Sequence, residues 1–414
     1  MFSLNPKKCT SVLLSLSLLM GNTAFAQGPG EKQQKKREAV PEAQVEKAVV
    51  KGFEDMRTFA DKSSAVFTED LIESIRQEPA GSFPAGRGGI KEYPVLAISG
   101  GGANGAYGAG VMSGWTASGT RPDFKIITGI STGALIAPFV FLGEEYDDEM
   151  KAMYTNYSTE DLMSKKVVVN VNNTSSLADN LGLKKIIKEN VTEEILAAIA
   201  EEHKKGKRLY VATTNLDAQR LVVWNMGEIA MVGNKKALNL FRDILLASTS
   251  IPIVFPPVLF DVVADGNDYQ EIHVDGGTVT QVTAMIGVFQ GFKDLAAKEG
   301  IDSSKMKVAL YIIQNGYFAP HWSRVRTNLP SIAQASMDTL IKSQSVGDIY
   351  RIYSLKGENV DFNLAHIPND YVPRAAELFD TEEMNRLFTM GYDAASKGYP
   401  WQKQPPMMEQ VKGK

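Results

Sequence analysis

Apolar residues along this chain occur in short unbroken runs and in helical spacings that follow one another in turn. The short runs predict buried strands, at residues 95–98, 125–128, 166–171, 208–214, 221–224, 258–263 and 307–313. Apolar positions three and four apart predict helices, at about residues 103–119, 132–142, 192–204, 234–247, 331–344 and 381–396. Because strands and helices alternate, we expect an α/β domain with three layers, in which helices cover both faces of a mainly parallel central sheet.

Before this domain, apolar positions recur from residue 41 at steps of four, four, three and three. They are Val45, Val49, Phe53, Met56 and Phe59. This spacing predicts one face of an amphipathic helix. We expect the helix to dock on the main domain rather than to lie in a membrane surface, because three nearby acidic residues dilute any basic face. Residues 79–89 are rich in glycine and proline and predict a loop.

The first 26 residues contain the three parts of a secretory signal peptide. Lys7 and Lys8 supply positive charge, residues 11–20 form an apolar run, and residues 24–26 have the small side chains of a cleavage site. The run is too short to span a bilayer, which takes about 20 residues. We therefore expect cleavage after Ala26, export to the periplasm, the outer membrane or the medium, and a polar linker over residues 27–38.

Composition narrows the possible functions. The chain has 414 residues, of which 44% are hydrophobic and 22% charged, as in ordinary globular proteins. Its net charge of −4 gives no support to nucleic-acid binding, which normally needs a basic surplus. A single cysteine, Cys9, and four histidines give no basis for a disulfide framework or a Cys- or His-rich metal centre. We expect a linker and helical extension over 27–92, a main domain over 93–400 and a frayed polar tail over 401–414.

A serine stands between a predicted strand and a predicted helix, in the sequence Gly129-Ile130-Ser131-Thr132-Gly133. A serine on such a sharp turn projects its hydroxyl above the sheet, and Gly129 and Gly133 avoid collisions in the strained backbone. The helix also points its positive amino end toward the serine. The arrangement is typical of a catalytic nucleophile, and a tight turn without chemistry is the alternative.

A glycine-rich loop follows the first predicted strand of the main domain. Its members are Gly100, Gly101, Gly102, Asn104 and Gly105. Successive glycines let backbone N–H groups turn toward one point, where they can bind a phosphate or the oxyanion of an acyl-transfer intermediate. A P-loop would need Lys followed by Ser or Thr, and this chain has Ala106 and Tyr107 there. A dinucleotide site stays open, because Asp123 stands about 20 residues further on.

The third candidate is the segment Asp275-Gly276-Gly277, which follows the apolar–polar residues 272–274. Asp-Gly most often marks a simple tight turn. The functional interpretation is an aspartate presented at the end of a strand, with the two glycines leaving room for a neighbouring backbone or a substrate. Together, the serine turn, the glycine-rich loop and the aspartate supply the three parts that acyl transfer needs.

An attacking serine needs a base that takes its proton. In a Ser–Asp–His order the histidine would follow Asp275, and His321 and His366 meet that condition. His273 shares a strand face with Asp275 and could line the site without acting as the base. A carboxylate within about 2.6–3.2 Å of the hydroxyl can also serve when a poorly solvated pocket raises its basicity. The residues alone leave both kinds of base open.

Taken in order, the three segments resemble the patatin-like phospholipase family. Ser99 with the glycines at 100–102 and 105, the turn at 129–133 and the Asp-Gly-Gly segment match its pattern, and residues 212–215 and 247–258 are similar to family segments. The likeness covers residues 93–320 well and the later residues loosely. It implies a patatin-like fold with a Ser–Asp dyad, in which Ser131 is the nucleophile and Asp275 the base. It also implies an oxyanion hole formed by backbone N–H groups of Gly100, Gly101 and Gly102.

The resemblance implies an exported serine acyl hydrolase that cleaves ester bonds of lipids through an acyl-enzyme, as phospholipases A and lysophospholipases do. It implies no metal or organic cofactor, and transient contact with a membrane surface. Many members carry Arg or Lys where this chain has Asn104, which offers a neutral donor instead. An acyltransferase, a thioesterase or a general carboxylesterase with the same dyad is an alternative. A non-catalytic module that holds an anionic lipid headgroup is less favoured.

Overall fold

The structure is a computed structural model that describes residues 37–164, 175–289, 291–322 and 324–406. The chain divides into the units Met1–Glu38 and Ala39–Lys414, and the first is described only at its last two residues. The signal peptide, the linker up to residue 36 and the strand at 166–171 lie outside the described residues and stay predictions. No helix of the described ranges has both the length and the apolar composition needed to cross a membrane.

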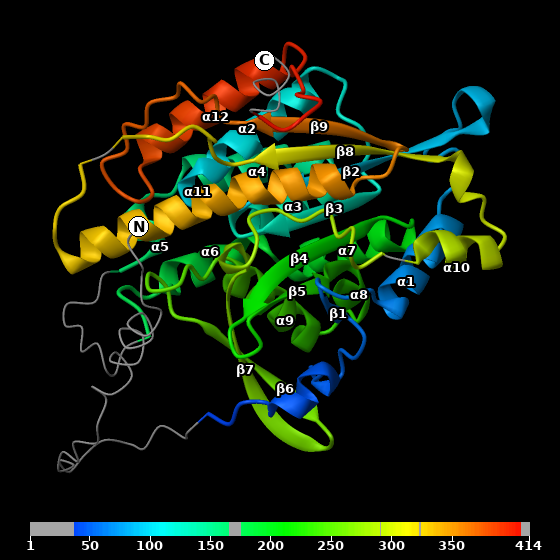
Figure 1. Cartoon of the computed structure of the whole chain (residues 1–414), viewed down its shortest axis with the longest axis horizontal. Coiled ribbons are helices and arrows are strands. Elements are labelled where there is room, and N and C mark those ends of the chain that lie inside the picture. The colour runs from blue at the N-terminus through cyan, green and yellow to red at the C-terminus, as the bar shows by residue number, and fades with distance from the viewer. Residues whose placement is uncertain (1–36, 165–174, 290, 323, 407–414) are drawn as a thin grey trace, which may run out of the picture. The chain divides into compact units, whose positions relative to one another are not determined.

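The described part of the second unit contains a nine-stranded mixed sheet. Its strands are β1 (Arg57–Phe59), β2 (Lys91–Ile98), β3 (Ile126–Ile130), β4 (Arg208–Asn215), β5 (Arg220–Asn225), β6 (Val258–Ala264), β7 (Asn267–Asp275), β8 (Met306–Gln314) and β9 (Val360–His366). The order is β1-β5-β4-β3-β2-β8-β9. Within it, β4, β3, β2, β8 and β9 are parallel neighbours, and β5 pairs antiparallel with both β4 and β1. The β6–β7 hairpin joins the sheet through β7, which pairs antiparallel with the carboxyl end of β4 (Figure 1).

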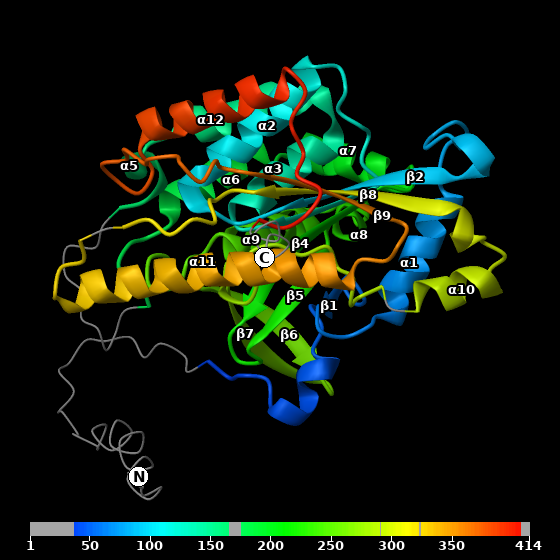
Figure 2. The same ribbon diagram turned by 45° about the horizontal axis from the view of Figure 1, so that its top comes forward.

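Helices cover both faces of the sheet, as Figure 2 shows. They are α1 (Ala65–Arg76), α2 (Gly105–Ala117), α3 (Thr132–Leu142), α4 (Asp147–Thr155), α5 (Thr159–Leu162), α6 (Leu181–Asn190), α7 (Glu193–Lys204), α8 (Met226–Met231), α9 (Lys235–Ser248), α10 (Phe292–Lys298), α11 (Leu329–Leu355) and α12 (Thr381–Ala395). One core contains side chains of α2, α3, α9 and α12, and the cores on the other face contain α1 and α11. This confirms the predicted three-layer α/β arrangement with a mostly parallel sheet.

The carboxyl end of β4 pairs with two different strands along one edge. β3 pairs with β4 as far as Ala212, and β7 pairs with it from Thr213 to Asn215, while β5 occupies the opposite edge. Ile130, the last residue of β3, is opposite Ala212, and Asp275, the last residue of β7, is opposite Thr213. The chain leaving β3 therefore meets the end of β7 at the carboxyl edge of the parallel strands, where α/β proteins commonly place their ligands.

The sequence pattern predicted the elements that build this edge. The predicted strands within the described residues correspond to β2, β3, β4, β5, β6 and β8, and the predicted helices to α2, α3, α7, α9, α11 and α12. The strand β7 corresponds to the one that the functional interpretation of Asp275 requires. The pattern did not predict β1, β9 or the helices α1, α4, α5, α6, α8 and α10.

The predicted amphipathic helix over residues 45–59 is wrong. The segment contains a short 3₁₀ turn, η1 (Glu42–Lys47), then a bridge from Val49 to Val263, and then β1, which pairs with β5. Gly52 and Asp55 have φ values of 86° and 63°, which no right-handed helix contains. Four of the five apolar residues, Val45, Phe53, Met56 and Phe59, pack against the main core although their spacing resembles that of a helix. Pairing with the sheet therefore outweighs the local periodicity.

The expectation of a frayed tail is wrong for residues 401–406. The Trp401 ring lies 4.7 Å from the Trp115 ring and 5.0 Å from the Tyr311 ring, measured between centroids. Gln402 also exchanges two backbone hydrogen bonds with Leu364 of β9, at 2.9 and 3.0 Å. Aromatic packing and the added backbone pairing outweigh the conformational entropy of the chain end here.

Helices α2 and α12 cross in backbone contact, which three glycines allow. A Cβ atom added at Gly110 would lie 2.1 Å from the Phe388 carbonyl oxygen, and one at Gly114 would lie 2.3 Å from the Tyr392 carbonyl oxygen. From the other helix, a Cβ at Gly391 would lie 2.3 Å from the Tyr107 carbonyl oxygen. Because α2 starts at the glycine-rich loop, this contact also fixes the helix that follows that loop.

Replacing Gly114 by alanine should push the two helices apart. We expect Gly114→Ala to lower the free energy of unfolding by about 1–3 kcal/mol, the usual cost of overpacking. Gly347→Ala is the matched control, because it lies in α11 with no atom within 4 Å of an added Cβ; alanine there should raise the free energy of unfolding by up to about 1 kcal/mol. Urea unfolding of both variants measures this, and equal shifts in one direction would contradict the contact.

Candidate active site

Ser131 occupies a strained turn between β3 and α3. Its backbone has φ 53° and ψ −124°, a conformation that residues with side chains rarely adopt. The glycines on either side are required by close packing, since a Cβ at Gly129 would lie 2.4 Å from the Gly133 carbonyl oxygen and one at Gly133 would lie 2.3 Å from the Ile98 carbonyl oxygen. The turn therefore has the geometry expected of a serine presented at the top of a sheet.

Two hydrogen bonds hold this serine. Its N–H donates to the Ser248 Oγ at 2.9 Å, and the Ser248 hydroxyl in turn donates to the Ala212 carbonyl oxygen of β4 at 2.8 Å. Its own hydroxyl donates to the Asp275 Oδ2 at 2.6 Å. The bond from the Ser131 N–H offsets part of the backbone strain. The bond from the Ser131 hydroxyl joins two residues that are 144 positions apart in the sequence.

Asp275 lies buried at the end of β7, with one carboxylate oxygen on Ser131 and the other on a backbone amide. Its N–H donates to the Ser250 carbonyl oxygen at 2.9 Å, and the Gly277 N–H donates to the Asp275 Oδ1 at 2.7 Å. Burial raises the pKa of the Asp275 carboxyl to about 7, because the hydrogen bonds from Ser131 and Gly277 offset only part of the desolvation. Near neutral pH this carboxyl can both accept and return a proton.

Of the three N–H donors expected in the glycine-rich loop, one is engaged elsewhere and two have no acceptor among the described residues. The Gly100 N–H donates to the Gln281 carbonyl oxygen at 2.9 Å, so this donor is already used. Within the described residues, the N–H groups of Gly101 and Gly102 have no acceptor, and the same holds for Thr132, the residue after the serine. Free amides at this position are suited to binding a developing negative charge on oxygen.

Close packing or a positive φ explains why glycine occupies each remaining glycine position of the loop. A Cβ at Gly101 would lie 2.2 Å from the Asn315 carbonyl oxygen, and one at Gly105 would lie 2.0 Å from the Thr132 Oγ1. Gly102 has open space around it but a φ of 56°, which favours glycine. Asn104 immediately precedes α2, and its side chain makes no hydrogen bond to the serine or to any other described residue.

Sequence reasoning missed Gln281, which links the glycine-rich loop to the aspartate loop. Besides its carbonyl bond to Gly100, its side-chain amide donates to the Gly277 carbonyl oxygen at 2.6 Å and to the Gln344 Oε1 at 2.9 Å. Its N–H donates to the Asp348 Oδ2 at 2.6 Å. The two loops are thus fastened to each other and to α11. No local motif marks this residue, because its partners are remote in sequence.

An apolar pocket opens beside the serine. Gly102, Ser131 and Thr132 are among the residues that line it. The remaining lining is mostly apolar and comes from the glycine-rich loop, α3 to α6, the segment after α9, and α12 with the loop before it: Ala103, Leu135, Met153, Tyr154, Leu162, Leu183, Ile186, Thr249, Ile251, Phe255, Phe379 and Met384. Below, these residues are called the apolar pocket. Its composition suits a hydrocarbon chain rather than a phosphate or a nucleotide.

The four histidines of the chain all lie in the described residues, and none makes a hydrogen bond to Ser131 or Asp275. The His366 Nε2 lies 2.9 Å from the Gln402 Nε2, and the His321 ring stacks on Tyr317 with 4.0 Å between centroids. The buried His273 Nδ1 lies 2.8 Å from the Thr213 Oγ1, and its Nε2 lies 3.1 Å from the Glu271 Oε2. The carboxyl is therefore the base that the geometry offers to the serine.

Two other places were candidates for binding. Asp70, His203 and Glu228 approach one another as metal ligands do, but both Asp70 oxygens already accept hydrogen bonds from the Arg208 Nε, at 2.9 and 2.8 Å. A cation there would face the guanidinium, so the cluster is better explained as a structural ion pair.

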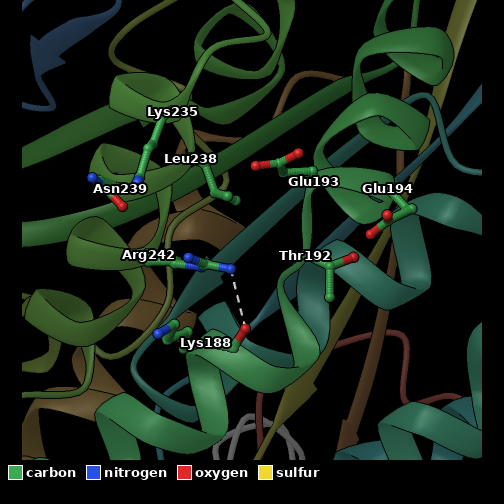
Figure 3. A pocket seen from close by; sticks show the side chains of 8 residues that line it. All are labelled: Lys188, Thr192, Glu193, Glu194, Lys235, Leu238, Asn239 and Arg242. Atoms are coloured by element: carbon green, nitrogen blue, oxygen red, sulfur yellow. Dashed lines mark hydrogen bonds between the residues drawn. The ribbon is translucent and has the colours of Figure 1, made fainter.

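A shallow hollow lies between α6, α7 and α9. Figure 3 shows Lys188, Lys235 and Arg242 near Glu193 and Glu194, with Arg242 donating to the Lys188 carbonyl oxygen at 3.1 Å. Three basic and two acidic side chains give the lining a net charge of only +1, and no serine or cysteine lines the hollow. It therefore offers no nucleophile for a catalytic role.

The raised pKa of Asp275 makes folding stability depend on pH. In the unfolded chain an aspartate titrates near about 4, so between about pH 4 and pH 7 the unfolded state releases a proton that the folded state keeps. Stability from this group is present below that range and is lost as pH rises through it. We expect the free energy of unfolding of the wild type, relative to Asp275→Asn, to fall across this range. Urea titrations test it, with the exposed Asp268→Asn as control; parallel curves for wild type and Asp275→Asn would contradict the burial argument.

One comparison with known proteins covers the three segments of this site. Residues 96–287, which include the serine, the aspartate and the glycine-rich loop, match the family model described as Patatin-like phospholipase. Over 108 residues the chain is 32% identical to the cUMP-AMP-activated phospholipase of Escherichia coli, covering 25% of this chain and 32% of that protein, or about a third of the relative's length. The crystal structure of VipD from Legionella pneumophila aligns with a TM-score of 0.38 and 15% identity over 75% of this chain and 68% of that one. Residues 96–287 thus belong to the patatin-like phospholipase family.

Proposed function

We propose that this protein is a serine acyl hydrolase that cleaves ester bonds of lipids, as a phospholipase A or lysophospholipase does. The observation that carries the proposal is the 2.6 Å hydrogen bond from the Ser131 hydroxyl to Asp275, next to the apolar pocket. Membership in the family supports a lipid hydrolase in general terms. The dyad and the type of phospholipase are our inference from the site.

In the proposed reaction, the Ser131 Oγ attacks the ester carbonyl carbon while its proton passes to the Asp275 Oδ2. The negative charge that forms on the carbonyl oxygen is stabilised by N–H groups of Gly101, Gly102 and Thr132, which are not engaged elsewhere in the described residues. The intermediate collapses, the alcohol leaves with the proton from Asp275, and an acyl-serine remains. Water then attacks the acyl-serine, giving its proton to Asp275. The bond between the acyl carbon and the Ser131 Oγ breaks as Asp275 returns this proton to the Oγ, and the fatty acid leaves.

The walls of the apolar pocket favour an acyl chain as the part of the substrate that they bind. Side chains such as Leu135, Ile186 and Phe255 offer no donor or acceptor, so a polar acyl group would lose its hydration there without replacement. Each buried methylene of a hydrocarbon chain contributes about 0.8 kcal/mol. Esters with an apolar acyl group are therefore favoured over esters with a polar one.

Removing either member of the dyad should abolish turnover. We expect Ser131→Ala and Asp275→Asn each to lower kcat for hydrolysis of a dispersed phospholipid by at least about a thousand-fold, since the nucleophile and its base act as a unit. Release of fatty acid, measured by mass spectrometry, gives the rates.

The histidines provide the control for that experiment. His321→Ala and His366→Gln should keep activity within a few-fold of the wild type, because neither ring contacts the serine. A circular dichroism spectrum and a urea midpoint like those of the wild type establish that each variant is folded. Loss of activity in either folded histidine variant would favour a Ser–Asp–His triad and contradict the dyad.

The rate of hydrolysis should report the titration of Asp275. Only the carboxylate can accept the serine proton, and its pKa is about 7, so kcat/KM should rise with pH and reach half its plateau near that pH. The ionisation enthalpy of a carboxyl is small and that of an imidazole is much larger. The pH at which kcat/KM reaches half its plateau should therefore change little with temperature. A half-plateau pH that shifts strongly with temperature, or a pH dependence that disappears in a histidine variant, would contradict this assignment.

A further inference from the structure

Helix α11 holds Gln281 by its backbone and by its side chain. Gln344 and Asp348 stand four positions apart in α11, so they share one face of the helix. The Gln281 side-chain amide donates to the Gln344 Oε1 at 2.9 Å, and the Gln281 N–H donates to the Asp348 Oδ2 at 2.6 Å. Gln281 and Asp348 are only 4% and 5% exposed. Since a hydrogen bond to a carboxylate is stronger than one between neutral groups, Asp348 has the larger part in fixing the Gln281 backbone.

On the side of the glycine-rich loop, Gln281 fixes the first of three successive amides. Within the described residues, Gly100, Gly101 and Gly102 make one hydrogen bond to a segment beyond the loop and α2, the bond from the Gly100 N–H to the Gln281 carbonyl oxygen. A Cβ atom at Gly100 would lie 3.1 Å from both the Gln281 Oε1 and the Ser131 Cβ, so the loop is packed between these two residues. A shift of Gln281 would therefore turn the amides of Gly101 and Gly102 away from the oxyanion that they are proposed to bind.

On the side of the base, Gln281 has a smaller part. Its side-chain amide donates to the Gly277 carbonyl oxygen at 2.6 Å, and the Gly277 N–H donates to the Asp275 Oδ1 at 2.7 Å. Asp275 is also held without Gln281, because its N–H donates to the Ser250 carbonyl oxygen at 2.9 Å and β7 pairs with β4. Displacement of Gln281 should thus disturb the amide donors more than the carboxylate.

We propose that Asp348 is a positioning residue for the reaction: through the Gln281 backbone, it holds the glycine-rich loop in the orientation that the oxyanion requires. Asp348 touches no reacting atom, and it acts from a helix that lines no part of the apolar pocket. The inference rests on the proposed function for the reaction that the loop supports. The orientation of the loop can also be measured without a lipid, so the two can be tested separately.

Asp348→Ala removes the acceptor of the Gln281 N–H. We expect kcat for hydrolysis of detergent-dispersed phosphatidylcholine to fall by about ten-fold to a hundred-fold, the usual effect of a small misplacement in an active site. KM should stay within about two-fold of the wild-type value, because the binding pocket keeps its walls. A higher KM with unchanged kcat would overturn the inference.

Asp348→Asn tests whether the accepting oxygen is what matters. Asparagine keeps an oxygen for the Gln281 N–H, and Arg351, the other partner of the carboxylate at 3.1 Å, has a side chain that is 58% exposed and can turn to water. We expect this variant to keep kcat within about three-fold of the wild type, since a neutral acceptor still satisfies the buried donor. A loss as large as that of Asp348→Ala would contradict the proposed role.

Asp147→Ala is the matched control for the loss of a buried carboxylate. Asp147 pairs with Arg121 at 2.8 Å, with side chains 15% and 8% exposed. Arg121 precedes β3, at the end of that strand opposite to Ser131. The control should lower the urea midpoint, as Asp348→Ala does, and leave kcat and KM unchanged. A purely structural role predicts the same result for both variants, so a folded Asp348→Ala with wild-type kcat would overturn the inference.

If Asp348→Ala does not fold, Asp348→Ser replaces it. Its hydroxyl is one bond shorter than the carboxylate and stays out of reach of the Gln281 N–H, while the site remains polar. The expected fall in kcat and the unchanged KM are the same, and wild-type kcat in folded Asp348→Ser would count against the proposal equally.

Labelling of Ser131 by a fluorophosphonate separates this inference from the proposed function. The labelling rate depends on the same amides, because they bind the phosphoryl oxygen, and no lipid is needed. We expect labelling to slow by about ten-fold or more in Asp348→Ala and to stay near the wild-type rate in Asp348→Asn. If labelling follows this pattern but the wild type releases no fatty acid, lipid hydrolysis fails and the positioning role stands. If the wild type releases fatty acid but Asp348→Ala matches it in kcat and labelling, only the positioning role fails.

Discussion

Strand β4 continues past the end of its parallel neighbour β3, and β7 pairs with the edge that β3 leaves uncovered. Because β4 changes its pairing partner from β3 to β7, the residue after β3 and the last residue of β7 lie side by side, and Ser131 and Asp275 meet. Every other feature of the site depends on it. The strained serine turn presents a hydroxyl, but a neighbouring acceptor is present only because an antiparallel strand enters the sheet beside it. The departure of the sheet from a purely parallel arrangement is thus what brings Ser131 and Asp275 into hydrogen-bond contact.

Burial and backbone hydrogen bonds then set the chemistry of the pair. A carboxylate in water is a weak base, and its removal from water raises the pKa of Asp275 into the neutral range. The two loops that flank it are joined by Gln281, which contacts Gly100 on one side and Gly277 on the other. A shift of either loop would therefore affect the amide donors and the carboxylate together.

The sequence predicted what short stretches of chain determine, and it left open what distant contacts determine. The strand, turn and helix around Ser131 follow from a local pattern, and the structure has them where they were expected. The choice between a carboxylate and His321 or His366 could not follow from spacing, because it depends on which segments meet in space. The helix expected over residues 45–59 failed for the same reason, since pairing of β1 with β5 is a distant contact. Gly100 was expected to donate to an oxyanion, and its bond to Gln281 became visible only in the folded chain.

The most direct test of the account is covalent labelling of Ser131 by a fluorophosphonate, located by peptide mass spectrometry in the wild type and in Asp275→Asn. The account predicts one adduct, on Ser131, and almost no adduct when the carboxylate is replaced, because the hydroxyl then has no base. Labelling of Ser131 at an unchanged rate in Asp275→Asn, or an adduct on another serine, would contradict the claim that these two residues act together.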